Sequence, residues 1–193
     1  IAEKYGIRII EDASHCIGAS FEGEPIGSCR YSDIAVFSFH PVKIITTAEG
    51  GVATTNSTKL FQSMSLARSH GVTRDPTLME NDSVGPWHYE QITLGYNYRM
   101  TDLQAALGIS QMRRLNEMVE RRSKLATRYN NMLRDLPIKI PIQSVDTLSS
   151  WHLYVIRVRT EQHRSIFDFL HSQDIGVNLH YMPVHLQPFY QRK

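Results

Sequence analysis

The sequence predicts an α/β fold, and three observations support this prediction. Continuous apolar runs, which are typical of strands buried on both faces of a parallel sheet, occur at 7–10, 33–39 and 51–55. Apolar residues with helical spacing follow over 57–71 and again from Thr101 to about Leu133. From Asp135 onward the pattern changes to that of a small α+β unit.

Turn and cap residues support the individual elements. The stretch "ASFEGEPIGS", 19–28, has short extended pieces around a Gly-Glu-Pro turn, which predicts a hairpin. Ser57 is the expected N-cap of the first long helix, and Gly71 is its expected C′ residue. In "TDLQ" the Thr101 hydroxyl can bond the amide of Gln104, whose side chain reaches back, so a capping box begins one long helix or two joined helices.

The remaining segments complete the predicted organisation. Residues 72–95 are polar and irregular, which predicts a long loop of the kind that often has a function. "WHLYVIRVR" alternates like a half-buried strand, "TEQHRSIFDFLHSQ" is an amphipathic helix, and "IGVNLHYM" predicts a further strand. We therefore expect residues 1–134 to form part of a large domain with a long linking helix, and residues 135–193 to form part of a small domain.

Composition excludes several classes of protein. The 193 residues are 41% hydrophobic and 21% charged, as in ordinary globular proteins. A formal net charge of +2 without a basic block argues against nucleic-acid binding, and no apolar run approaches the ~18 residues of a membrane span. Cys16 and Cys29 form no CxxC motif and fit a reduced, cytoplasmic protein. The nine histidines lack the spacing of a zinc site, so we expect no metal.

A single lysine stands just beyond an apolar strand in "SFHPVKIITTAEGG", Ser38 to Gly51. A desolvated lysine is a nucleophilic amine that can form a Schiff base, but a lone lysine such as Lys43 is more often structural. Asp12 ends the first strand, where α/β proteins bind ligands, and its carboxylate could face the pyridine nitrogen of pyridoxal phosphate or cap the next turn. The Ser38 hydroxyl could bond a phosphate or simply close its strand.

Four stretches decide between these alternatives: "EDASHCIGASFEGEPIGS" with "SDIAVFSFHPVKIITTAEGG", "LGYNYRMTDLQAALGISQMRRL", "SSWHLYVIRV", and "NLHYMPVHLQPFYQRK". In this order they resemble the DegT/DnrJ/EryC1/StrS family of pyridoxal phosphate-dependent nucleotide-sugar aminotransferases, which have fold type I. The last stretch most resembles the members of pseudaminic acid synthesis, which aminate C4 of a UDP-4-keto-6-deoxy-N-acetylhexosamine. Family members begin well before Ile1 and continue past Lys193, so we expect an internal piece of the enzyme.

The resemblance implies a role for each matching residue. Lys43 matches the catalytic Schiff-base lysine, Asp12 the partner of the pyridine nitrogen, and Ser38 a phosphate-binding hydroxyl. His15 matches a residue near the phenolic oxygen of the ring, and Asn97 an asparagine that reaches the cofactor phosphate of the neighbouring subunit. The residues that match the region contacting the sugar nucleotide are His180, Tyr181 and His185. Pyridoxal 5'-phosphate, a sugar nucleotide, glutamate and a homodimer with shared active sites are thereby implied.

Two other functions stay open. A sugar dehydratase of the same family carries histidine in place of the Schiff-base lysine, so Lys43 argues against it. A non-catalytic relative used for binding or regulation is opposed by the intact Asp12, Ser38 and Lys43, although a partial chain need not be active by itself. One departure is Ala48, where the family usually has glycine. If this position needs a positive φ, its methyl group costs about 1 kcal/mol.

Overall fold

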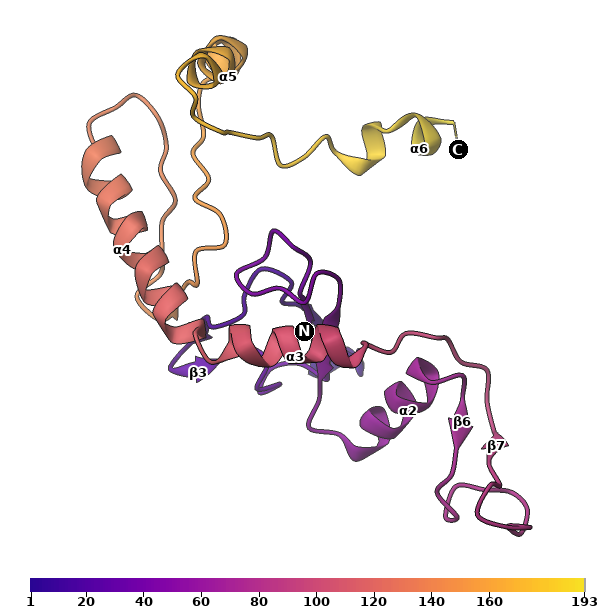
Figure 1. Ribbon diagram of the computed structural model, residues 1–193. Coiled ribbons are helices and arrows are strands. Elements are labelled where there is room, and N and C mark those ends of the chain that lie inside the picture. Colours follow the sequence, from indigo (N-terminus) through magenta and orange to yellow (C-terminus); the bar gives the residue numbers. More distant parts are fainter. Residues whose placement is uncertain (193) are drawn as a thin grey trace. The chain divides into compact units, whose positions relative to one another are not determined.

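The computed structural model describes residues 1–192, and Figure 1 gives the order of the elements. It divides into two compact units. Unit 1 comprises Ile1–Met132 and Ile142–Tyr154, and unit 2 comprises Leu133–Pro141 and Val155–Lys193. Ile142–Tyr154 thus groups with unit 1 in this chain. The boundary at 134/135 remains our proposal for the domains of the whole protein.

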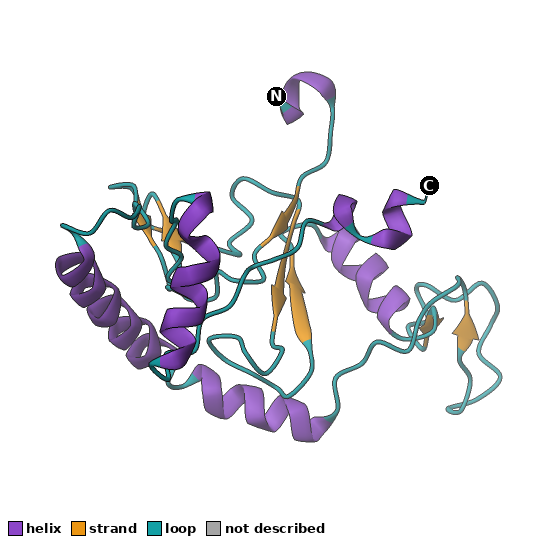
Figure 2. Ribbon diagram, turned by 90° about the horizontal axis from the view of Figure 1, so that it is seen from above, coloured by secondary structure: helices purple, strands orange, loops and turns teal. Residues whose placement is uncertain are grey.

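A three-stranded sheet of order β1-β4-β5 forms the centre of unit 1, and Figure 2 shows its strands side by side. β1 (Ile10–Asp12) runs parallel to β4 (Ile34–Ser38), and β5 (Gly51–Thr54) runs antiparallel to β4. All three strands were expected, and the α/β class is confirmed. Because β1 and β4 are parallel, their carboxyl ends lie at the same edge of the sheet.

The core of this sheet is narrow. The buried residues are Ala13, Ala35 and Phe37. Five partly buried side chains pack against them: Cys16, Ile17, Ile26, Cys29 and Phe39. The expectation that the first strand is buried on both faces is wrong, because Ile10 is 68% exposed. Within residues 1–192 β1 pairs only with β4, so it is an edge strand, and its Ile10 and Asp12 side chains are exposed.

The predicted hairpin is present as β2 (Ser20–Phe21) and β3 (Glu24–Pro25), which pair in antiparallel fashion. A third strand, β8 (Thr147–Leu148), pairs with the other side of β2. A short helix, α1 (Ala2–Tyr5), precedes β1 and ends at Gly6. The antiparallel pairing therefore ties the segment around 147 to the loop that follows β1.

The first long helix of unit 1 begins at its predicted cap residue but does not end at the predicted one. α2 (Thr58–Arg68) begins at Ser57, whose side chain accepts from the amide of Leu60. Its C-cap is Ser69, so the expectation that Gly71 is the C′ residue is wrong. His70 occupies that position with φ +61.

Two separate helices, α3 (Asp102–Met112) and α4 (Leu115–Leu133), follow one another in Figure 1. The predicted capping box of Thr101 and Gln104 is present. The predicted loop contains two short antiparallel strands, β6 (Val72–Thr73) and β7 (Glu90–Gln91).

Unit 2 contains helical elements and little extended pairing. The elements are η1 (Thr160–Gln162), α5 (His163–Ser172), η2 (Val184–Leu186) and α6 (Pro188–Gln191). The helix expected from "TEQHRSIFDFLHSQ" is therefore confirmed.

The predictions of strands in "WHLYVIRVR" and "IGVNLHYM" are wrong for this chain. In the first segment, the described part of the chain has one isolated bridge, between Lys139 and Arg157. A strand needs a neighbour for its backbone N–H and C=O groups, and apart from this bridge neither segment pairs with another strand within residues 1–192. Of the described residues, no helix combines the length and apolarity required to cross a membrane.

Candidate active site

Asp12 and Ser38 end the two parallel strands at one edge of the sheet. The Asp12 carboxylate is exposed and accepts a hydrogen bond from the Ser14 amide at 3.1 Å. Hydrogen bonds from Ser14 hold the pKa of Asp12 below its ordinary value, and the charges of His15 and Lys43 act in the same direction. The structure therefore brings an ionised carboxylate, an imidazole and an amine into electrostatic range of one another.

Lys43 follows β4 through a tight turn. The Ser38 hydroxyl accepts from the His40 amide at 3.4 Å, and the Lys43 amide donates to the His40 carbonyl at 2.9 Å. The next two residues, Ile44 and Ile45, are buried and anchor the turn. The Lys43 side chain is half-buried rather than buried, so the desolvated setting suggested by the sequence is incomplete in this chain.

The loop after Lys43 is fastened to the end of β4 by two threonines. The hydroxyl of Thr46 and the amide of Thr47 both donate to the Phe39 carbonyl, at 2.9 and 3.0 Å. The Thr47 hydroxyl donates to the Glu49 carbonyl at 2.8 Å. Ala48, between them, has φ +66, so the suspected left-handed backbone is confirmed. Sequence reasoning missed these threonines, although the pair "TT" before the Ala-Glu-Gly-Gly turn was visible.

A distant segment packs against the residues that follow Asp12. The ring of His152 lies against that of His15, with centroids 4.3 Å apart. The Ser150 hydroxyl donates to the His15 carbonyl at 3.4 Å across 135 residues of sequence. Sequence reasoning assigned no role to His152, although the stretch "SSWHLYVIRV" was one of those that resembled the family.

Other predicted site residues are not joined to this group. Asn97 forms an isolated antiparallel bridge with Ser69, beyond the C-terminal end of α2. Its neighbours in sequence, Tyr96 and Tyr98, stack their rings on each other with centroids 4.8 Å apart. Among the described residues, Asn97 has no hydrogen bond or ring contact with Asp12, His15 or Lys43, which we call the Asp12 group. Three of the predicted residues belong to unit 2 and are exposed: His180, Tyr181 and His185. Their relation to Asp12 therefore stays a prediction.

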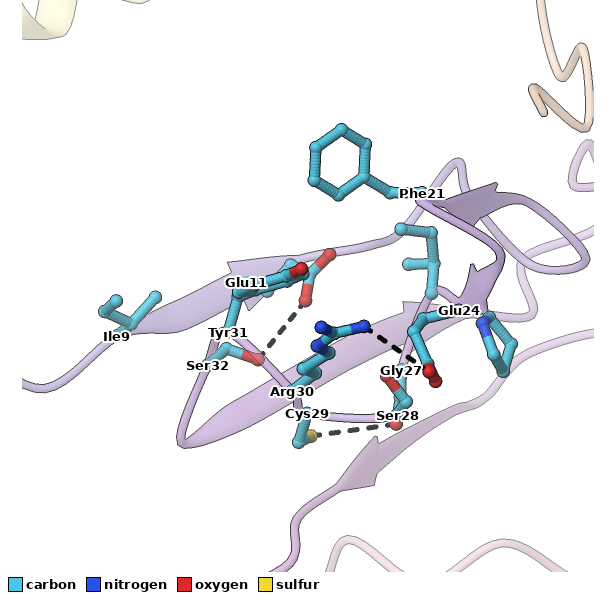
Figure 3. Close-up of a pocket in the computed structure, with 12 residues that line it drawn as sticks. Ile9, Glu11, Phe21, Glu24, Gly27, Ser28, Cys29, Arg30, Tyr31 and Ser32 are labelled. Carbon is cyan, nitrogen blue, oxygen red and sulfur yellow. Dashed lines mark hydrogen bonds and ion pairs between the residues drawn. The ribbon is translucent and has the colours of Figure 1, made fainter. Parts of the chain in front are cut away.

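Neither of two cavities in unit 1 contains Asp12 or Lys43. The first cavity has a volume of about 300 Å³, and Glu11 lines it. In Figure 3, the Ser32 hydroxyl donates to the Glu11 carboxylate at 3.2 Å, and Arg30 forms an ion pair with Glu24 at 3.5 Å. Neighbouring residues of a strand point to opposite faces, so the side chains of Glu11 and Asp12 lie on opposite faces of β1.

The second cavity, of about 650 Å³, lies among apolar residues of β5 and α3, with Arg68 and Arg113 in its lining. Asp12 and His15 are instead exposed, and Lys43 is half-buried. Within residues 1–192 no group of three His, Cys, Asp or Glu side chains could hold a metal ion.

The Asp12 group fits pyridoxal phosphate by its chemistry. An ionised carboxylate suits the protonated pyridine nitrogen, and the Lys43 amine within its electrostatic range suits the aldehyde. The hydroxyl of Ser38 at the same strand edge can donate to a phosphate.

Known proteins are similar to this chain over nearly its whole length. A transaminase of UDP-4-amino-4,6-dideoxy-N-acetyl-β-L-altrosamine from Campylobacter jejuni is 37% identical over 196 residues, which cover 100% of this chain and 49% of the relative. The structure of Helicobacter pylori PseC, an aminotransferase of pseudoaminic acid biosynthesis, matches with a TM-score of 0.88 and 30% identity over 99% of this chain and 50% of that one. Spr1654 of Streptococcus pneumoniae, described as a sugar aminotransferase and solved in a PLP-form, matches with a TM-score of 0.83 and 31% identity over 96% of this chain and 47% of its own.

The chain spans about half the length of the curated relatives that it matches. The model of the DegT/DnrJ/EryC1/StrS aminotransferase family matches residues 1–193. The protein therefore belongs to the DegT/DnrJ/EryC1/StrS aminotransferase family.

Proposed function

We propose that the whole protein is a pyridoxal phosphate-dependent aminotransferase that transfers the amino group of glutamate to a 4-keto-6-deoxy sugar nucleotide. The observation that carries this proposal is the group of Asp12, His15 and Lys43 at the carboxyl edge of β1 and β4 in a chain of this family. Relatives named as sugar-nucleotide transaminases and a structural relative in a PLP-form support it.

Each residue has a task that follows from its chemistry. Bound pyridoxal phosphate supplies an aldehyde that takes up the amino group and a protonated ring that withdraws electrons from the carbon being deprotonated. The ionised carboxylate of Asp12 keeps the pyridine nitrogen protonated. The Ser38 hydroxyl would donate to the phosphate. The Lys43 amine would hold the cofactor through its aldehyde and, once released, would move the proton at the donor's Cα as a general acid–base.

The proposed acceptor is a UDP-linked N-acetylhexosamine with a keto group at C4. The support is the similarity to the Campylobacter and Helicobacter proteins, together with the exposed polar and aromatic side chains of His180, Tyr181 and His185. We further propose a cytoplasmic homodimer in which Asn97 reaches the cofactor phosphate of the partner subunit. The exposed position of Asn97, apart from the Asp12 group, leaves it available for such a contact.

An amination assay with the full-length protein tests this function. Glutamate is the donor, UDP- and dTDP-linked keto sugars are the acceptors, and Lys43→Ala is the control. We expect an amino sugar from a UDP-4-keto substrate and none from the control. Loss of a sugar hydroxyl without amination would instead identify a dehydratase. Cofactor binding without turnover of any sugar would support a binding or regulatory relative.

A further inference from the structure

His152 is a second histidine beside the candidate cofactor site, and the proposed reaction gives it no task. Its ring is half-buried and lies against the ring of His15 at a tilt of 57°. His15 in turn lies within electrostatic range of the Asp12 carboxylate. A side chain whose ring packs against another has few rotamers left, so His152 limits where the His15 imidazole can lie.

The backbone of His152 is itself held from α4. The guanidinium of Arg122 donates to the carbonyl of Trp151 at 3.0 Å and to that of His152 at 3.3 Å. The Trp151 amide donates to the Ser149 hydroxyl at 3.1 Å, and Trp151 has φ +52. An arginine shared between two successive carbonyls fixes the direction of the chain at this point.

The same segment also holds the main chain of His15. Ser150 is 1% exposed, and its hydroxyl donates to the His15 carbonyl. His15 is therefore contacted twice from 150–152, once through its carbonyl and once through its ring. Two contacts from one anchored segment define both the position and the orientation of a side chain better than either contact alone.

We propose that His152 is a positioning residue that holds the His15 imidazole in place beside Asp12, with Arg122 as its anchor on α4. This inference rests on the proposed function, because the cofactor gives the position of His15 its importance. His152 acts through His15 and needs no contact with the cofactor or the substrate.

Histidine NMR of the full-length, cofactor-free protein tests the contact. The His15 signal is assigned from its loss in His15→Gln. In His152→Leu, which keeps apolar volume but removes the ring, we expect the His15 signal to shift and broaden. His152→Phe, which restores a ring, should return the signal close to its original position, and His163→Ala is the control in α5. An unchanged His15 signal in His152→Leu would overturn the inference.

A double-mutant cycle on the dissociation constant of pyridoxal phosphate tests the consequence. His152→Leu should weaken binding roughly two- to tenfold, the range expected for one ring–ring contact. In a His15→Ala background the same change should have no further effect, because His152 acts through His15. Equal effects in both backgrounds would contradict the proposal. If the unaltered protein does not bind the cofactor, the proposed function fails, and the NMR result alone decides whether His152 positions His15.

Discussion

Asp12 is the residue on which the proposed reaction depends most. Its pKa lies below the ordinary value of 3.8, chiefly because Ser14 donates hydrogen bonds to it and also because His15 and Lys43 are near. Asp12 is therefore ionised throughout the neutral range. The sequence predicted Asp12, His15 and Lys43 as residues of one cofactor site. It could not predict the contact between His15 and His152, because 136 residues lie between these two histidines in the chain.

Replacing Asp12 by asparagine should lower kcat strongly and cofactor affinity less. A charge-assisted hydrogen bond contributes roughly 1.5–3 kcal/mol, and its loss matters most when the substrate carbon carries negative charge. We expect kcat of Asp12→Asn to fall at least about tenfold, measured with glutamate and saturating cofactor. A kcat within a few-fold of the unaltered protein would show that Asp12 is not the partner of the pyridine nitrogen.

Ala48 stores strain in the loop that follows the lysine. Its φ of +66 suits glycine, so Ala48→Gly should raise the free energy of unfolding by about 1 kcal/mol. Urea unfolding of the full-length protein measures this change. The matched control is Ala53→Gly in β5, where the same change should destabilise by roughly 0.5–1 kcal/mol. A loss of stability in Ala48→Gly would contradict the assigned backbone conformation.

At the level of elements, Asp33, just before β4, holds the two residues that precede β1. Its carboxylate accepts from the Ile9 amide at 2.9 Å and pairs with Arg8 at 2.7 Å. The Ile9 amide is the main cause of a pKa below the ordinary value of 3.8, with Arg8 acting in the same direction. A lowered pKa in the folded state means that this stabilisation is complete above the unfolded value and is lost as the pH falls through the folded value.

Asp33→Asn should therefore destabilise the protein at pH 7, and the deficit should become smaller as the pH falls from the unfolded pKa of an aspartate, near 3.8, toward pH 3. The measurement is the urea midpoint of both proteins at the two pH values, and Asp146→Asn, at an aspartate whose carboxylate forms none of these bonds, is the control. An equal deficit at both pH values would mean that the charge of Asp33 has no part in holding β1.

The elements that the sequence predicted are those whose signals are local. Ser57 and the Thr101–Gln104 capping box act within one helical turn, and their caps form as expected. β4 is central and apolar, so its hydrophobic pattern was sufficient to predict the strand. The segment "WHLYVIRVR" failed as a strand because alternation gives the preference of a chain but not the presence of a neighbouring strand. The exposure of β1 was not predicted for the same reason: an apolar run does not show whether a strand has neighbours on both sides.

At the scale of the whole molecule, the proposed homodimer builds each site from two subunits. Lys43→Ala and Asn97→Ala should each impair activity as homodimers. Because a two-fold contact repeats the same arrangement twice, a heterodimer would carry one site with both defects and one site with neither. Unfolding and refolding a mixture should therefore restore about a quarter of the original activity.

Two comparisons make this result interpretable. The single-variant homodimers are refolded separately, and heterodimer formation is verified with distinguishable tags. If heterodimers form and no activity returns, Asn97 does not serve the partner's site. It would then be a structural residue of the bridge to Ser69.

The most direct test of the central claim is to identify the lysine that holds the cofactor. The full-length protein is loaded with pyridoxal phosphate, reduced with borohydride, digested and mapped by mass spectrometry. We predict that the reduced cofactor is attached to Lys43, in the turn beside Asp12. Attachment to Lys59 or Lys124, or to no lysine of this chain, would contradict the account.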